Sequence, residues 1–180
     1  KGARFMTADM VNFFLASPMR RAEYMKIKWK HLPEDIRARY NLGDKVTEDG
    51  YVYVRIEKGM YGLKNAAILA YDHLKENLAP HGYTPIAGTT GMWEHKTRRT
   101  KFCVCVDDFG IKYYTHEDAM HLLNAIGKSY DYTVDWTGSN YCGLHIVWDY
   151  EAGRVNISMP GYVQKALKRL QHTPLTSPQH

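Results

Sequence analysis

Short segments in which apolar and polar residues alternate recur along this chain, and they restrict it to folds that contain a β-sheet. The alternation is regular over residues 51–56 and 102–107, and residues 5–9 form a further short apolar segment. A period of two predicts half-buried strands, because successive side chains of a strand point to opposite faces. Residues 144–148 and 155–159 alternate on either side of a turn and predict a hairpin.

Only three segments have the helical period, so helices are fewer than strands. One covers about 64–79 and ends at Pro80, and another covers about 162–170. The remaining helix is expected to begin after Thr115, whose hydroxyl can cap it while Asp118 follows three residues later. Strands interleaved unevenly with few helices predict an α+β fold, in which an antiparallel sheet has helices packed on one face.

The length of the chain fits one domain with a hydrophobic core. Residues 31–50 are rich in charge and contain Pro33 and Gly43, which predicts an excursion over the surface. The segment from His172 onward is expected to be a loose tail. Because the chain starts directly before a strand-like segment, we expect it to be a piece of a longer protein.

Charge and cysteine content narrow the classes of partner. The net charge of +5 and the pI of about 9.0 favour an anionic partner without identifying it. The three cysteines form no CxxC pair, and the nine histidines show no metal-ligand spacing. A disulfide framework and a zinc site are therefore not expected, and a reducing, intracellular setting fits best. No apolar run is long enough to cross a bilayer, so no membrane partner is expected.

Two adjacent acids, Asp107 and Asp108, follow directly after an apolar strand, and Gly110 and another strand-like run come next. Two carboxylates at a tight turn repel one another, and a divalent cation such as Mg²⁺ relieves that repulsion. A two-metal site needs a further carboxylate from another strand, and Asp9, which ends residues 5–9, is the candidate. The same acids also fit an ordinary hairpin turn and a helix cap, so the spacing alone leaves both interpretations open.

Four blocks of the sequence resemble the palm motifs of copia-type retrotransposon reverse transcriptases. In chain order, the blocks read TADMVNFFL at residues 7–15, KGMYGLK at 58–64, VDD at 106–108 and YCGL at 141–144. Their order and separations match the family over about residues 5–171. An isolated pair of aspartates would be weak evidence, whereas four ordered blocks together are specific.

The resemblance implies a polymerase palm-like (ferredoxin-like) α+β domain over residues 1–160, with a partial fingers insert at about 31–50. Residues 161–180 would begin the thumb and end in the loose tail. The implied activity is RNA-directed DNA polymerisation, in which two Mg²⁺ ions, with Mn²⁺ as a substitute, promote nucleotidyl transfer from a dNTP to a primer 3′-hydroxyl. The implied partners are an RNA or DNA template with its primer, dNTPs, and the fingers, thumb and RNase H regions of the same Pol polyprotein. Such elements act in the cytoplasm, in virus-like particles and in the nucleus.

The resemblance also assigns roles to individual residues. The catalytic and metal-binding acids would be Asp9, Asp107 and Asp108. The residues that contact the nucleotide would be Met10, Phe13, Phe14, Lys64 and Asn65. The residues that contact primer or template would be Gly62, Cys105, Tyr141, Cys142 and Gly143. Phe14 falls where the family places an aromatic steric gate against ribonucleotides, and its ring edge is expected to be open to a cleft. The backbone amides from Met10 to Phe13 would approach the triphosphate.

The sequence departs from the family pattern at several positions, among them Tyr141 and Cys142 in place of a Phe-Leu pair, and other functions remain open. Cys105 stands where an aromatic residue is usual, Asn65 where Gln is usual, and Ala67 where Pro is common. These changes leave open a degenerate, catalytically inactive remnant that only binds nucleic acid or protein. A third interpretation is an RNA-binding module unrelated to polymerases, which requires exposed aromatic residues on a sheet face, such as Tyr51 and Tyr53.

Overall fold

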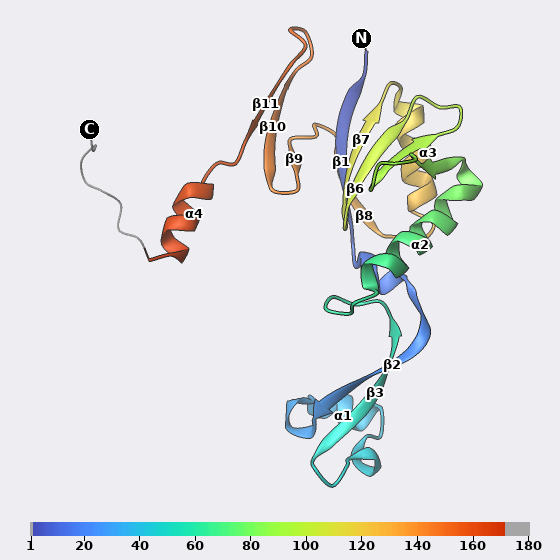
Figure 1. Ribbon diagram of the computed structural model, residues 1–180, viewed down its shortest axis with the longest axis vertical. Coiled ribbons are helices and arrows are strands. Elements are labelled where there is room, and N and C mark those ends of the chain that lie inside the picture. Colours follow the sequence, from blue (N-terminus) through green and yellow to red (C-terminus); the bar gives the residue numbers. More distant parts are fainter. Residues whose placement is uncertain (1, 172–180) are drawn as a thin grey trace. The chain divides into compact units, whose positions relative to one another are not determined.

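The computed structural model describes residues 2–171, and these form two compact units. The first unit combines Lys1–Val11 with His81–His180, and the second is the continuous segment Asn12–Pro80. The α+β class that the sequence predicts is confirmed, since antiparallel sheets are combined with helices (Figure 1). The expected tail from His172 lies outside the described residues. No helix within residues 2–171 is long and apolar enough to cross a membrane.

A six-stranded antiparallel sheet forms the centre of the first unit, with the strand order β4-β5-β6-β7-β1-β8 (Figure 1). The strands are β1 (Arg4–Met10), β4 (Tyr83–Pro85), β5 (Met92–His95), β6 (Lys101–Cys105), β7 (Asp108–Tyr113) and β8 (Tyr132–Asp135). The strands β1 and β7 lie side by side although residues 11–107 separate them in the sequence. Because β1 lies between β7 and β8, Asp9 at the end of β1 lies beside Asp107 and Asp108.

One face of this sheet is buried by apolar side chains. Met6 and Ala8 of β1 pair with Ile111 and Phe109 of β7, and all four side chains are buried. Helix α3 (His116–Ile126) contacts β7, and its buried stripe consists of Ala119, Leu122, Leu123, Ala125 and Ile126. The expected cap is confirmed, because the Thr115 side chain accepts a hydrogen bond from the Asp118 amide.

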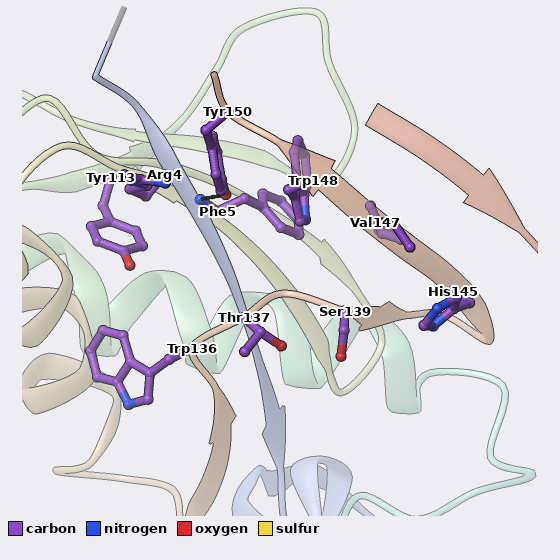
Figure 2. A pocket seen from close by; sticks show the side chains of 11 residues that line it. Arg4, Phe5, Tyr113, Trp136, Thr137, Ser139, His145, Val147, Trp148 and Tyr150 are labelled. Carbon is purple, nitrogen blue, oxygen red and sulfur yellow. Dashed lines mark hydrogen bonds between the residues drawn. The ribbon is translucent and has the colours of Figure 1, made fainter. Parts of the chain in front are cut away.

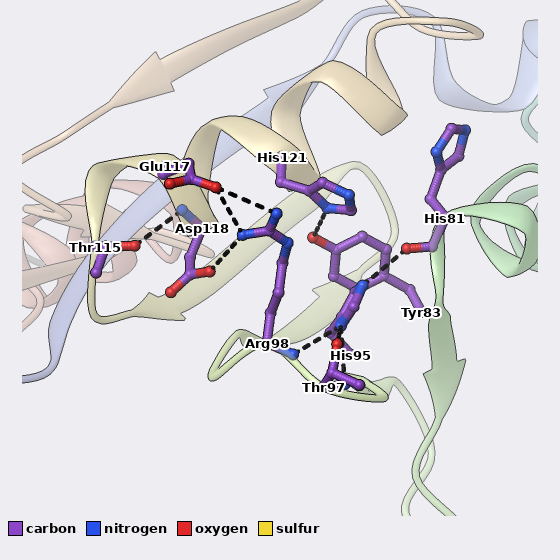
Figure 3. Close-up of polar contacts among 9 residues, drawn as sticks. All are labelled: His81, Tyr83, His95, Thr97, Arg98, Thr115, Glu117, Asp118 and His121. Atoms are coloured by element: carbon purple, nitrogen blue, oxygen red, sulfur yellow. Dashed lines mark hydrogen bonds and ion pairs between the residues drawn. The ribbon is translucent and has the colours of Figure 1, made fainter.

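A polar network ties the loop after β5 to the first turn of α3 (Figure 3). The His95 Nδ1 atom accepts the backbone N–H groups of Thr97 at 3.1 Å and Arg98 at 2.9 Å, so its Nε2 carries the proton and donates it to the carbonyl of His81 at 3.0 Å. The Arg98 guanidinium then pairs with Asp118 at 2.9 Å. His95 therefore shapes the loop, and the loop places the Arg98 guanidinium beside the first turn of α3.

The first unit continues into a three-stranded sheet with the order β11-β10-β9. Its strands are β9 (Asn140–Tyr141), β10 (Leu144–Asp149) and β11 (Arg154–Ser158), and α4 (Tyr162–Arg169) follows. Aromatic contacts join β10 to the start of β1 (Figure 2): the rings of Phe5 and Trp148 lie 5.0 Å apart, and the Phe5 amide donates to the Tyr150 hydroxyl at 3.0 Å. A cavity of about 430 Å³ opens beside these rings.

The second unit contains the two-stranded ribbon of β2 (Pro18–Lys28) and β3 (Tyr51–Lys58). Its helices are α1 (Glu34–Arg39) and α2 (Ala66–Leu78), and its short 3₁₀ helices are η1 (Phe13–Ala16), η2 (Trp29–His31) and η3 (Gly43–Lys45). The 3₁₀ helix η4 (Ala79–His81) spans the boundary between the two units in the sequence. Helix α2 contacts η1. The segment 31–50 is more than the expected surface excursion, because Leu32 and Leu42 form a small core with Val52.

All three predicted helices are confirmed, and so are the six predicted strand segments, which include the run after Gly110 in β7, although the strand at 102–107 ends at Cys105. The sequence did not predict β2, the longest strand, or the short strands β4, β5, β8 and β9. The residues of β2 mix charges with scattered apolar residues, and it bears a bulge between Pro18 and Glu23, so no clean period of two is visible.

Candidate metal centre

Asp9 and Asp108 lie directly opposite each other in the antiparallel pair of β1 and β7. Side chains of directly opposite residues point to the same face of a sheet. Because Met6 and Ala8 point to the buried face, Asp9 points to the other, open face, and Asp108 shares it. The register therefore places two carboxylates next to each other at the end of the central sheet.

Asp107 belongs to the tight turn that joins β6 to β7. Cys105 pairs with Asp108, so Val106 and Asp107 are the two central residues of the turn. The carbonyl of Asp107 accepts the Met10 amide at 3.0 Å, which ties the turn to the end of β1. Val106 has a φ of 59°, a left-handed conformation that strains a β-branched residue and that glycine usually adopts in such turns.

The charges of the neighbouring acids act on Asp9. Partial burial raises the pKa of Asp9 above its usual value, and the negative charges of Asp107 and Asp108 raise it further. A cation placed among the three carboxylates would offset the repulsion between them. No group of three or more His, Cys, Asp and Glu side chains converges on a metal position anywhere in residues 2–171. The three acids would therefore have to change rotamer to share an ion.

The turn between β9 and β10 covers part of the open face beside these acids. Tyr141 pairs with Leu144, and the two residues between them have positive φ angles, 49° for Cys142 and 78° for Gly143. Two consecutive left-handed residues make a tight primed turn, in which glycine is the favoured second residue. Residues 141–144 therefore form a tight turn, and glycine at 143 fits its backbone.

The Tyr141 ring packs over Gly110 of β7, a position of the central sheet that has no side chain. A Cβ atom added to Gly110 would come within 2.9 Å of the Cys103 Sγ and of the Phe5 ring, and within 3.2 Å of the Tyr141 ring. Burial, together with a hydrogen bond to Cys103, raises the pKa of the Tyr141 hydroxyl. Cys103 and Gly110 were not among the residues that the sequence assigned to the site. The signal that could have found them was their position on the same strand face as Cys105 and Asp108.

The sulfur atoms of this face lie close to the acids. Burial raises the pKa of the Cys142 thiol to about 12, and a hydrogen bond with Cys105 and the charge of Asp108 act in the same direction. Four of the residues assigned to the site are thus brought together in the first unit: Cys105, Tyr141, Cys142 and Asp108. They surround the end of the sheet that also carries Asp9.

The backbone amides after Asp9 are not available in the way that the resemblance implied. The Met10 amide donates to the carbonyl of Asp107 at 3.0 Å, and the Val11 amide donates to the carbonyl of Asp131 at 2.8 Å. The Met10 side chain is 1% exposed and belongs to the core. The expected approach of these two amides to a triphosphate is therefore wrong, because β1 continues as a paired strand through Met10.

Phe14 and Phe13 are core residues of the second unit. Phe14 is 7% exposed, and its ring meets the Tyr61 ring at 4.6 Å in an edge-to-face contact. The backbone of Gly59 passes so close that an added Cβ would lie 2.8 Å from the Phe14 carbonyl oxygen. The expectation of a ring edge open to a cleft is wrong, because this packing encloses the ring.

The other expected nucleotide and template residues of the second unit are exposed. Gly62 has a φ of 94°, which other residues rarely adopt, and Lys64 is exposed. Asn65 occupies the N-terminal cap position of α2 without a side-chain capping bond, and it lines a cavity of about 220 Å³ together with Arg20 and Arg21. Asn65 therefore remains accessible to a ligand.

Comparison of the chain with protein-family models, with curated proteins and with solved structures finds no significant match.

Proposed function

We propose that the chain is part of an RNA-directed DNA polymerase of the copia retrotransposon type and that Asp9, Asp107 and Asp108 are its metal ligands. The observation that carries the proposal is the direct pairing of Asp9 with Asp108 across β1 and β7. Two acids from separate strands and a third in the adjoining turn are the donor set that two Mg²⁺ ions require. The ordered sequence motifs assign the same three residues.

The acids would act by holding the metal ions rather than by transferring protons themselves. The bound ions would supply a polarised primer 3′-hydroxyl and would neutralise the charge that develops on the leaving pyrophosphate. The raised pKa of Asp9 supports this role, because the repulsion that raises it is relieved when a cation binds. The turn formed by Tyr141, Cys142 and Gly143 lies beside the acids, at the position where a primer end would be held.

An inactive remnant that only binds nucleic acid or protein is the second candidate function. Two observations favour it: Phe14 is enclosed by other side chains, and the Met10 amide is already bonded. Both remove contacts that a polymerase of this family would make to the incoming nucleotide. The two candidates make different predictions for metal binding and for primer extension.

Metal binding is tested by thermal unfolding of the parent chain with EDTA and with Mg²⁺. The ion should raise the melting temperature of the parent, since a ligand that binds only the folded state stabilises it. Asp107→Asn keeps the size of the side chain and removes its charge, and it should abolish most of the Mg²⁺-dependent rise. Glu151→Gln is the matched control, because Glu151 is an exposed acid in the hairpin turn between β10 and β11. Equal Mg²⁺ effects in all three proteins would contradict the metal site.

Catalysis is tested by primer extension with the chain joined to the fingers and thumb regions of its parent protein. Extension should require Mg²⁺ and should fall in Asp107→Asn by several powers of ten, since each 1.4 kcal/mol of lost transition-state stabilisation lowers the rate about tenfold. Equal extension by the parent and the variant would show that Asp107 is not catalytic. If neither extends a primer although both are folded, the inactive remnant is the correct interpretation.

A further inference from the structure

The β2–β3 ribbon has one face on which every cross-strand pair joins a tyrosine to a cation. The three pairs are Tyr24 with Arg55, Lys26 with Tyr53, and Lys28 with Tyr51. We call this surface the ribbon face; it consists of Tyr24, Lys26, Lys28, Tyr51, Tyr53 and Arg55. Directly opposite residues share a face, so the six side chains form two adjacent rows in which rings and charges alternate.

The other face of the ribbon fixes its orientation. Val52 is fully buried against Leu32 and Leu42, and the partly buried Ile27 and Val54 pack against the same cluster. Because side chains alternate along a strand, this small core leaves the ribbon face pointing away from it. Tyr24 is 63% exposed and Tyr53 is 54% exposed. Large exposed rings gathered on one surface are typical of binding sites rather than of an ordinary solvated face.

The charges on the ribbon face are held close to the rings. The Lys26 ammonium lies 4.0 Å from the centre of the Tyr51 ring and 5.7 Å from that of Tyr53, and the Lys28 ammonium lies 5.8 Å from the Tyr51 ring. Two acids partly neutralise the surface: Asp49 pairs with Lys26 at 2.7 Å, and Glu57 pairs with Arg55 at 3.0 Å. Within residues 2–171, no carboxylate pairs with Lys28.

We propose that the ribbon face binds single-stranded nucleic acid. Every base has two flat faces that stack on an aromatic ring, and the phosphates between successive bases need a cation close to each ring. On the ribbon face each tyrosine lies directly opposite a cation, so a stacking ring and a charge for a phosphate stand side by side in every pair. A duplex hides its base faces and would use only the charges, so the exposed rings favour a single strand. This binding requires no metal ion and is independent of the function proposed for the acids.

The test is a fluorescence anisotropy titration of the intact chain with a fluorescein-labelled oligothymidylate in EDTA. Tyr53→Ala should weaken binding by roughly 5- to 100-fold, the range found when one stacking ring is removed, and Tyr53→Phe should bind like the parent. Tyr40→Ala is the matched control, because Tyr40 is 57% exposed, lies in the same unit and is beside Arg39, but it is not on the ribbon face. Circular dichroism confirms that each variant is folded.

Charge variants test the second half of the proposal. Lys28→Gln should weaken binding and reduce the slope of log affinity against log salt by about 0.7, the value for one lost phosphate contact on a single strand. Asp49→Asn should strengthen binding, since it frees the Lys26 ammonium for a phosphate. Glu151→Gln should bind like the parent, because Glu151 is an exposed acid in the turn between β10 and β11 and lies outside the ribbon face.

Three results would overturn the proposal. If Tyr53→Ala binds as tightly as Tyr40→Ala, the exposed rings do not stack on bases. If an unlabelled duplex displaces the probe as well as a single strand does, the binding reflects charge alone. If the folded parent chain does not bind the probe at low salt, the ribbon face is a surface of cation–π pairs that only stabilise the hairpin.

Discussion

Replacement of Phe14 by alanine should destabilise the protein strongly, because the ring belongs to the core of the second unit. A phenylalanine side chain buries at least about 150 Å² when it is enclosed, and Phe14 is 7% exposed. At about 25 cal/mol per Å², the lost burial is worth roughly 4 kcal/mol. The edge-to-face contact with Tyr61 at 4.6 Å adds to this value, whereas partial collapse of the cavity reduces it. We therefore expect a loss of about 3–5 kcal/mol in the free energy of unfolding.

Urea denaturation followed by circular dichroism measures this change. Leu15→Ala is the matched control: Leu15 is the next residue and is 46% exposed, so its truncation should cost less than about 1 kcal/mol. Phe14→Leu retains most of the volume and should lie between the two. A loss below about 1 kcal/mol for Phe14→Ala would refute the reasoning, because an enclosed ring cannot be removed at so small a cost. That result would also restore Phe14 as a candidate steric gate with an accessible ring.

Three further predictions concern polar side chains. Asp9→Asn should raise the melting temperature in EDTA at neutral pH. Burial and the neighbouring acids raise the pKa of Asp9, so the stability of the parent falls as the pH rises through that pKa. An unchanged melting temperature would contradict this. Thr115→Ala should lower the free energy of unfolding by about 1 kcal/mol, because the Asp118 amide loses its capping acceptor, whereas Thr115→Ser keeps the hydroxyl and should not. Equal losses of unfolding free energy for the two variants in urea denaturation would show that the hydroxyl is not the cause. Asp135 is partly buried, which would raise its pKa, but hydrogen bonds that include one from Thr137 lower the pKa to about 2. The ionised carboxylate therefore stabilises the folded protein above the usual pKa of 3.8, and this contribution is lost as the pH falls towards 2. Asp135→Asn should remove that part of the acid dependence, and parallel acid-unfolding curves for parent and variant would refute the assignment.

The sequence correctly predicted the helices and strands that are determined by capping residues and by the spacing of apolar residues. The cap at Thr115 and the helical period after it correctly placed α3, and the alternation from 144 to 159 correctly placed β10 and β11. The same reasoning missed β2, whose inward side chains are few and whose bulge interrupts the alternation. A strand that packs against a small core of three buried residues leaves a weak periodic signal.

The candidate site was predicted in part for a similar reason. The position of Asp9 at the end of a strand was visible in the sequence, but its pairing with Asp108 depends on which strands become neighbours, and period two does not determine that. The enclosure of the Phe14 ring depends on Tyr61, which reaches it through tertiary packing. An apolar residue near an acid looks the same in sequence whether its ring is a gate or part of a core.

The central position of β1 has a consequence for how the protein folds during synthesis. Both neighbours of β1 follow much later in the chain: β7 begins at Asp108 and β8 begins at Tyr132. At about 5–20 residues per second, the ribosome needs several seconds to deliver them, and both edges of β1 are unpaired during that time. The intervening segment Asn12–Pro80 is continuous and can fold first. Its early folding would shorten the loop that must close before the strands meet, and an unpaired β1 is the point at which a chaperone would act or aggregation would begin.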